Sequence, residues 1–222
     1  MNGHPGPDNF NGKEAPQGRV PSRERIDEMI PSIEDCFSYM KTYRMLDNIR
    51  AHSVVVARVA QMLARELRAV NGSLSMERVV AGALMHDIGK TRALESGENH
   101  ADLGRRICLD HDLVEIAGIV GEHVQLSAPD LKGEISEKEI VYYADKRVNH
   151  DRVVPLAERL SYILERYAKN DRTIQGRIMR NFEFCRAVEK KLFRPLPMDP
   201  QDVPDLVEKE RLGFNPTESL EG

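Results

Sequence analysis

Apolar side chains recur every three or four positions along most of the chain, which is the spacing of one face of an α-helix. The pattern is clearest between residues 46 and 71, where Asn71-Gly72 supplies a stop signal. It returns at residues 112–123, 136–149, 154–168 and 173–192. No window of β-branched residues alternates convincingly with polar ones. The pattern therefore predicts an all-α fold, a bundle of about seven helices.

Residues 75–88 differ from this amphipathic pattern because they are apolar nearly all round. A helix of that composition is typical of a protein interior, so we expect it to be central and buried and to end at Gly89. Ser136 and Glu139 form a capping-box pattern at the start of a later helix. A shorter amphipathic helix is expected to begin at His100.

The helical pattern is confined to residues 22–194, which we interpret as one domain. Residues 1–21 are rich in glycine, proline and asparagine and offer almost nothing to bury, so we expect a disordered tail. From residue 195 onward, repeated prolines are expected to interrupt any helix, and the chain ends with acidic residues. Residues 195–222 are therefore predicted to form a proline-rich acidic tail.

Charge and composition argue against nucleic-acid-binding, membrane-spanning and secreted proteins. The net charge of −4 comes from 32 basic and 36 acidic residues that are interleaved, so we expect no stable nucleic-acid binding. No apolar run reaches the roughly 18 residues of a membrane span, and the first residues do not form a signal peptide. The cysteines Cys36, Cys108 and Cys185 are widely spaced, which predicts reduced core residues and a cytoplasmic protein.

Side chains that commonly bind metals lie at helix ends or on apolar stripes: His52, His86, Asp87, His100, His123 and Asp145. Burying a carboxylate alone is expensive, and the usual remedies are a partner or a metal. A lone histidine on an apolar face is more often a satisfied core residue, but this many together favour a metal site. Imidazole and carboxylate ligands suit Fe, Mn, Zn, Ni or Co rather than Ca or Mg alone.

The order of these residues resembles the HD-domain superfamily of metal-dependent phosphohydrolases, in its HDIG subgroup. Residues 86–90 read HDIGK, His52 precedes them, and His100, Gly121-Glu122-His123 and Ala144-Asp145 follow. An HD dipeptide alone carries no information, since two more occur at His111-Asp112 and His150-Asp151. The ordered series over residues 52–145 carries the resemblance, which implies an HD-domain-like helical bundle.

The resemblance also implies roles for the ligands. A minimal family site would bind one ion through His52, His86, Asp87 and Asp145, with Asp151 as a reserve for the last position. In binuclear members the HD aspartate bridges two ions, so here Asp87 would bridge while His100 and His123 complete the second site. The implied cofactor is a pair of divalent transition-metal ions, which can share a hydroxide and polarise a phosphoryl group.

Two basic residues are candidates for binding substrate phosphate. Lys90 follows the HD pair by one turn, where a lysine can complement a helix dipole or bind phosphate, and its place beside the ligands favours phosphate. Arg147 follows Asp145 and is the second candidate, although an ion pair or a solvated face is at least as good an interpretation for it.

The resemblance implies hydrolysis of a phosphate ester or anhydride of a nucleotide or similar small molecule, with Asp87 and the metals activating water. Di-iron oxygenases resembling inositol oxygenase share the ligand set, so oxygen chemistry is an alternative. A regulatory HD domain that only binds a nucleotide is another. Lys90 and the HDIG form favour hydrolysis, and the completeness of the ligand series argues against a degenerate sensor.

Overall fold

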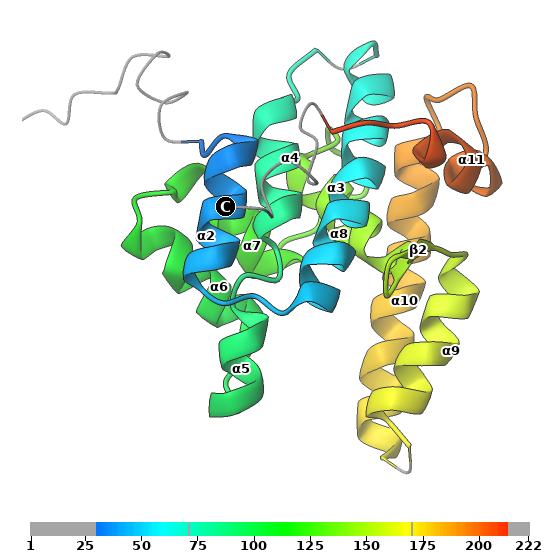
Figure 1. The fold of residues 1–222 in the computed structure, drawn as a ribbon. Helices are drawn as coiled ribbons and strands as arrows, with labels where there is room; N and C mark the ends of the chain where they lie inside the picture. The colour runs from blue at the N-terminus through cyan, green and yellow to red at the C-terminus, as the bar shows by residue number, and fades with distance from the viewer. Residues whose placement is uncertain (1–29, 71, 170, 213–222) are drawn as a thin grey trace, which may run out of the picture.

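The computed structural model describes residues 30–70, 72–169 and 171–212. The predicted all-α fold is confirmed (Figure 1). Its elements are α2 (Ile33–Thr42), α3 (Asp47–Arg68), α4 (Met76–Met85), α5 (Lys90–Ser96), α6 (His100–Asp110), α7 (Val114–Glu122), α8 (Glu137–Lys146), α9 (Leu156–Tyr167), α10 (Arg172–Phe193), the 3-10 turn η1 (Pro200–Asp202) and α11 (Val203–Glu208). A short antiparallel hairpin, β1 (Val148–Asn149) and β2 (Arg152–Val153), joins α8 to α9.

Local sequence signals fix several helix starts. The Ser136 hydroxyl accepts from the Glu139 backbone amide while the Glu139 carboxylate accepts from the Ser136 amide, so the predicted capping box is present. At α6, the Asn99 side chain accepts from the first backbone amides, and the helix begins at His100 as expected. These caps set the ends of two helices that carry predicted ligands.

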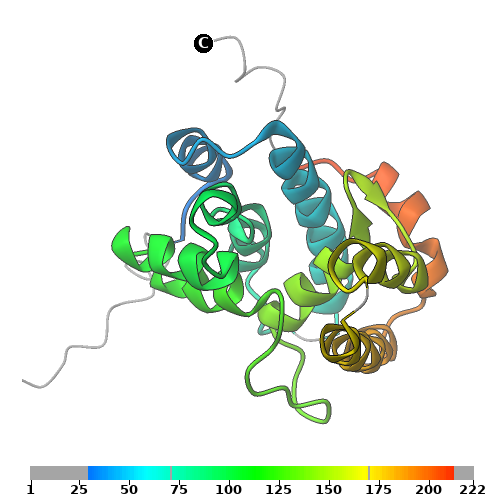
Figure 2. The same cartoon turned by 90° about the horizontal axis from the view of Figure 1, so that it is seen from below.

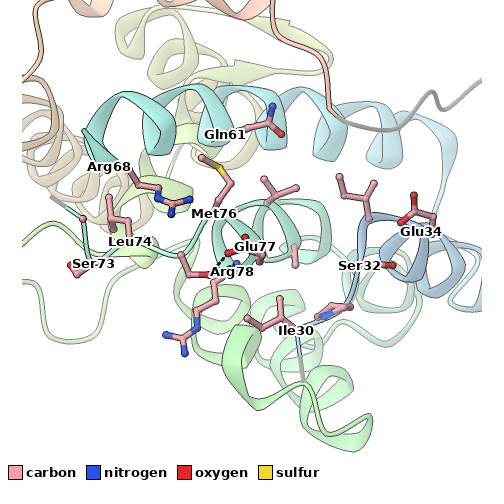
Figure 3. Close-up of a pocket in the computed structure, with 16 residues that line it drawn as sticks. Ile30, Ser32, Glu34, Gln61, Arg68, Ser73, Leu74, Met76, Glu77 and Arg78 are labelled. Atoms are coloured by element: carbon pink, nitrogen blue, oxygen red, sulfur yellow. Dashed lines mark hydrogen bonds between the residues drawn. The ribbon is translucent and has the colours of Figure 1, made fainter. Parts of the chain in front are cut away.

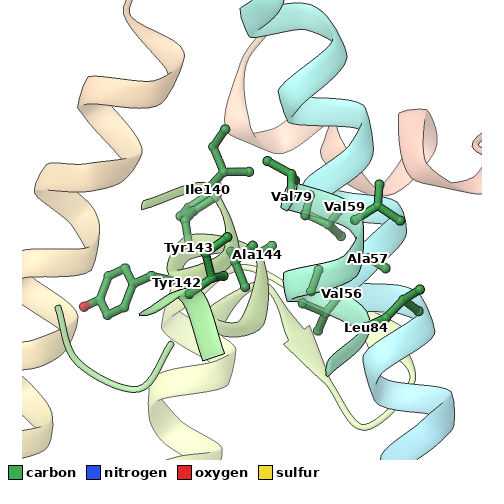
Figure 4. Packing of buried hydrophobic residues seen from close by; sticks show 14 of the residues in the cluster. Val56, Ala57, Val59, Val79, Leu84, Ile140, Tyr142, Tyr143 and Ala144 are labelled. Atoms are coloured by element: carbon green, nitrogen blue, oxygen red, sulfur yellow. The ribbon is translucent and has the colours of Figure 1, made fainter. Parts of the chain in front are cut away.

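The core is centred on α4, which packs against α3, α7 and α8. Residues Val79 to Met85 are all buried, which confirms that the apolar helix is central. Figure 4 shows Val56 of α3 beside Leu84 of α4, with Ala144 of α8 close by. The helix is shorter than expected because it ends at Met85, and residues 86–89 form a turn instead.

The structure corrects the expectation for the C-terminal segment. Prolines do not exclude helices there, because Pro200 and Pro204 occupy first-turn positions where no amide donor is needed. Val203 and Val207 of α11 are buried, and Arg58 of α3 donates to the Val207 carbonyl oxygen at 2.6 Å. Residues 200–212 therefore pack on the bundle. The predicted tail over residues 1–21 lies outside the described residues.

Helices α2, α5 and α11 were not predicted; α5 and α11 are only seven and six residues long, which is too short for a helical period to stand out. Helix α5 and the antiparallel α9–α10 pair extend from the same end of the molecule (Figure 1). Figure 2 views that end, with the α9–α10 pair on one side and the green helices α5, α6 and α7 on the other. Among the described helices, none combines the length and apolar character needed to cross a membrane.

Candidate metal centre

The predicted ligands reach one place from elements that are far apart in the sequence. Helices α3 and α8 contribute His52 and Asp145, and α6 begins with His100. His86 and Asp87 lie in the turn after α4, and His123 directly follows α7. Each side chain thus stands on a helix or at its end, where packing fixes the backbone.

His52, His86 and Asp87 form the first cluster, with ligand atoms that all lie within 4.8 Å of one another. Asp145 joins it, because its Oδ1 lies 3.1 Å from His52 Nε2 and 3.8 Å from His86 Nε2. This arrangement brings together the four residues of the minimal one-ion site.

Asp87, His100 and His123 form the second cluster, again within 4.8 Å. Asp87 Oδ1 lies 3.4 Å from His100 Nε2 and 3.6 Å from His123 Nε2. Its other oxygen, Oδ2, lies 3.4 Å from His86 Nε2 in the first cluster. One carboxylate oxygen therefore faces each cluster, which is an arrangement that a bridging carboxylate can adopt.

Backbone carbonyl groups orient most of the imidazoles. The Nδ1 atoms lie at hydrogen-bonding distance from carbonyl oxygens: His52 from His150 (2.8 Å), His86 from Ala83 (2.7 Å) and His123 from Val120 (2.6 Å). A carbonyl only accepts, so each Nδ1 carries the proton and donates it. In the neutral ring this proton position leaves the Nε2 lone pair facing the clusters, as in metal-binding histidines generally.

The polar atoms at the centre lack partners, and this tests whether a metal fits. His86 and Asp87 are buried, and His86 Nε2 and Asp87 Oδ1 have no hydrogen-bond partner among the described residues. Each such atom costs about 1–3 kcal/mol when unpaired, and more if charged. A divalent cation in each cluster would satisfy these atoms, and the nitrogen and oxygen donor set suits a transition metal. The residues present therefore fit a metal site.

Neighbouring cations keep the carboxylates charged. Burial alone would raise the pKa of Asp87, but the positive charges of His86 and Lys90 outweigh it and hold that pKa well below its usual range. Burial is likewise outweighed at Asp145, where Lys146 is the main cause of a strongly lowered pKa. Both carboxylates are thus in the ionised form that binds metals.

Burial has the opposite effect on the second-cluster imidazoles. It lowers the pKa of His100 to about 4 and also lowers the pKa of His123, so both rings are neutral near pH 7. Burial also opposes protonation of His86, but the adjacent Asp87 charge raises its pKa. Neutral imidazole is the metal-binding form, so the second cluster is ready for a cation.

A cleft of about 460 Å³ opens onto these residues. Asp87, His100, His123 and Asp145 line its polar part. The remaining wall is largely apolar and comes from α5 (Ala93 and Leu94), α9 (Ile163 and Tyr167) and α10 (Ile174, Ile178 and Phe182). The cleft therefore places an apolar surface beside a highly polar floor.

A larger cavity of about 1010 Å³ lies elsewhere, between α3 and α4 and the start of α2 (Figure 3). Gln61, Arg68, Glu77 and Arg78 are among its polar side chains. None of the predicted ligands lines it, so size alone does not identify the site. The smaller cleft is the better candidate because the ligand clusters open into it.

Two lysines lie close to the carboxylates. Lys90 lines the cleft, and its Nζ donates to Asp87 Oδ2 at 2.7 Å. This is the place where phosphate binding was predicted for it. Lys146 is buried, donates to the backbone carbonyl of His123, and lies 3.3 Å from Asp145 Oδ2. It ties two ligand-bearing segments together.

Arg147, the second residue predicted to contact phosphate, lies away from the cleft. Its guanidinium is buried and donates to the carbonyl oxygens of Val154 at 2.8 Å and Pro200 at 3.0 Å. It also donates to the Tyr143 hydroxyl. Arg147 does not line the cleft, and its donors are used to hold the hairpin and the C-terminal segment against α8. Its role in the described structure is to support the fold.

Arg159 of α9 takes the place expected for Arg147. It lines the cleft, donates to Asn149 Oδ1 at 3.0 Å and lies 3.9 Å from Asp145 Oδ1. Its buried Nε has no partner among the described residues. No sequence signal singles out Arg159, since an arginine within an amphipathic helix usually faces water. Asp151, the reserve ligand, is exposed and belongs to neither cluster.

Gly89 lets the turn after α4 approach α6. A Cβ at this position would lie 2.4 Å from the His100 carbonyl oxygen and 2.6 Å from the Gly104 amide nitrogen. Real Cβ contacts are essentially never this short, and both neighbours are backbone atoms that cannot rotate away. The glycine of the HDIG motif thus allows the HD pair to lie beside His100.

Residues 49–150 match the family model of the HD domain. This match identifies an HD domain within the chain, and the HD-domain superfamily is one of metal-dependent phosphohydrolases. The resemblance that the ordered ligands indicated is confirmed. The match covers the part of the chain that supplies all six predicted ligands, whereas α9 and α10 lie outside it.

Several curated proteins are similar to this chain. A tRNA (cytidine(56)-2'-O)-methyltransferase of Picrophilus torridus is 31% identical over 147 residues, which cover 60% of this chain and 41% of that protein. A Ribonuclease Y of Treponema denticola is 31% identical over 129 residues, or 53% of this chain and 23% of that protein. An uncharacterized protein of Methanocaldococcus jannaschii is 28% identical over 148 residues, or 62% and 88%. The first two are therefore matched over less than half their length. No solved structure gave a significant match.

Proposed function

We propose that this protein is a metal-dependent phosphohydrolase that cleaves a phosphate ester or anhydride of a nucleotide or related molecule. The observation that carries the proposal is the position of Asp87. Its two oxygens face two ligand clusters at the floor of one cleft, with the Lys90 ammonium group beside them. Two divalent ions bound there would lower the pKa of a water nucleophile and neutralise phosphoryl oxygens.

The side chains of the chain itself would bind and orient the substrate. Lys90 and Arg159 place positive charge at the rim of the polar floor, where a phosphoryl group must lie to reach the clusters. Arg159 has an unpaired buried Nε and a planar guanidinium, so it is the better geometric match to a phosphate. Lys146 is committed to the protein and would hold Asp145 and the His123 segment in place.

The apolar part of the cleft would hold the organic portion of the substrate. Tyr167 of α9 and Leu94 of α5 are both largely exposed and face the same cleft. Aromatic and aliphatic side chains of this kind stack on planar groups without requiring particular hydrogen bonds. This favours a nucleotide over a small polar phosphate ester.

The relatives extend the range of substrates to nucleic acid. The printed names of two of them refer to tRNA and to ribonuclease activity. Because this chain matches only part of those proteins, their activities do not transfer directly. They favour testing phosphodiesters of RNA beside mononucleotides, although the overall charge of −4 argued against nucleic acid.

The competing functions make different demands on the site. A di-iron oxygenase would use the same donors, but Lys90 and Arg159 at the cleft favour an anionic substrate. A regulatory domain would not need a complete ligand set, and all six predicted ligands converge here. Hydrolysis is the function that uses the most of the observed features.

The test is to measure metal content and turnover together. Wild-type protein loaded with Mn²⁺ or Fe²⁺ is assayed against bis(p-nitrophenyl) phosphate and mononucleotides, with and without oxygen. We expect oxygen-independent hydrolysis that Asp87→Ala abolishes together with most bound metal, while His100→Ala loses mainly one ion. His111→Ala is the matched control, because it alters an HD dipeptide outside both clusters. Full turnover by Asp87→Ala, or turnover that requires oxygen, would refute the proposal.

A further inference from the structure

A second hollow of about 440 Å³ adjoins the cleft. It is lined by Gln125, Leu126, Pro129, Arg177, Arg180, Asn181 and Phe184. Asn181 lines the cleft as well, so the two hollows meet at this residue. We call this second hollow the arginine groove.

The same two segments form the walls of both hollows. In the segment after α7, His123 and Val124 line the cleft, and the next residues line the arginine groove. On α10, Ile178 lines the cleft and Arg177 lines the groove. Asn181 Nδ2 donates to the Val124 carbonyl oxygen at 3.0 Å, which joins the walls at the boundary. A ligand that leaves the cleft beside Asn181 therefore enters the arginine groove.

The charges of the groove are unpaired. Arg177 and Arg180 are exposed, and neither forms a hydrogen bond or an ion pair with any residue that the structure describes. No acidic side chain lines the groove. By contrast, Lys191, which lies farther along α10, donates hydrogen bonds to the Glu139 carboxylate and to backbone carbonyl oxygens. The two guanidinium groups are thus available to an external anion.

A nucleic-acid strand combines the features that this groove could recognise. Guanidinium groups bind phosphates through paired hydrogen bonds, and an aromatic ring offers a stacking surface for a base. Phe184 supplies that ring beside the arginines, and it is only partly buried. Because the two hollows share Asn181, a strand with one phosphate at the metals would place the next ones toward the arginines.

We propose that the arginine groove binds the phosphates of a single-stranded oligonucleotide whose neighbouring phosphodiester lies at the metal centre. The inference rests on the proposed function and specifies its substrate as a strand rather than a free mononucleotide. It also revises the expectation that the protein does not bind nucleic acid. That expectation came from the net charge of −4, which is a sum over the whole chain and does not report two unpaired arginines at one place on the surface.

The test measures binding and turnover with the metal-loaded protein. The probe is a fluorescein-labelled pentauridylate with phosphorothioate linkages that resist hydrolysis, and its anisotropy reports binding at several salt concentrations. Arg177→Gln/Arg180→Gln is compared with Arg172→Gln/Arg186→Gln, which removes the same charge from exposed positions of α10 outside both hollows. Inorganic tripolyphosphate serves as a competitor without bases.

We expect the groove variant to bind the pentamer about tenfold or more weakly, and the control variant to bind as wild type does. The slope of log affinity against log salt should fall by roughly 1.4 in the groove variant, or about 0.7 for each lost phosphate contact. In turnover, the gain in kcat/KM from mononucleotide to trinucleotide should disappear only in the groove variant.

Equal binding by both variants would overturn the inference while leaving hydrolysis of bis(p-nitrophenyl) phosphate, and hence the proposed function, intact. The inference would also be overturned if tripolyphosphate displaced the labelled pentamer from wild type as well as an unlabelled pentamer of matched charge does, because the bases would then contribute nothing to binding. Absence of hydrolysis of every phosphate ester would instead refute the proposed function.

Discussion

Replacing Gly89 by alanine should separate the two halves of the metal centre. The new Cβ would lie 2.4 Å from the His100 carbonyl oxygen and 2.6 Å from the Gly104 amide nitrogen. Ordinary contacts of this kind are about 3.4 Å or longer, so the turn and α6 must move apart by roughly 1 Å. Because His100 is the first residue of α6, that movement carries its imidazole away from Asp87, which is 3.4 Å distant.

The Gly89→Ala substitution is expected to lower both the stability of the protein and its catalytic rate. Overpacking of a tight core contact destabilises a protein by about 1–3 kcal/mol, which corresponds to a fall in Tm of roughly 2–12 °C for a chain of this size. Displacement of a catalytic group by roughly 1 Å can lower the rate by about 100-fold. The second ion should be lost more readily than the first, since His100 belongs only to the second cluster.

Calorimetry of Gly89→Ala measures the loss of stability, metal analysis measures the loss of the second ion, and the turnover assay measures the loss of rate. Gly72→Ala is the matched control, because a Cβ there would meet nothing within 4 Å. We expect the control to keep the Tm and the metal content of wild type. If Gly89→Ala also kept two ions and an unchanged Tm, the close approach of the turn to α6 would not position His100, and the reasoning would fail.

Three further predictions follow from the cleft and its supports. Arg159→Gln should raise KM for a phosphate ester about tenfold with metal content unchanged, and an unchanged KM would remove its role in phosphate binding. Arg147→Met should lower the free energy of unfolding by about 3 kcal/mol, because the buried carbonyl oxygens of Val154 and Pro200 lose their donor. Arg50→Met is the control and should change that free energy little, because it alters an exposed ion pair. Equal effects of the two substitutions would contradict the role of Arg147 in supporting the fold. Removal of the metal by a chelator should lower Tm by several degrees, since a bound ligand present at about 100 times its Kd adds roughly 2.7 kcal/mol to the free energy of unfolding. An unchanged Tm after verified loss of metal would show that bound metal does not stabilise the buried Asp87 and Asp145 carboxylates.

The sequence alone determined the helical class, the central position of α4 and the identity of the clustered ligands. Helix periodicity and capping are properties of neighbouring residues, so the stripe around His52 and the box at Ser136 could be read directly. The candidate ligands could be named because they lie at helix ends or on apolar stripes and because their order resembles the HD-domain series. Those signals do not depend on how the helices are arranged.

Only the tertiary structure decided which arginine reaches the cleft and what the C-terminal segment does. Arg147 directly follows α8 and points into the fold, whereas the hairpin from Val148 to Val153 turns the chain so that Arg159 faces Asp145. The prolines after residue 195 predicted a tail, but Val203 and Val207 find an apolar surface on the bundle. Both outcomes depend on contacts between segments distant in the sequence, and local patterns carry no information about them.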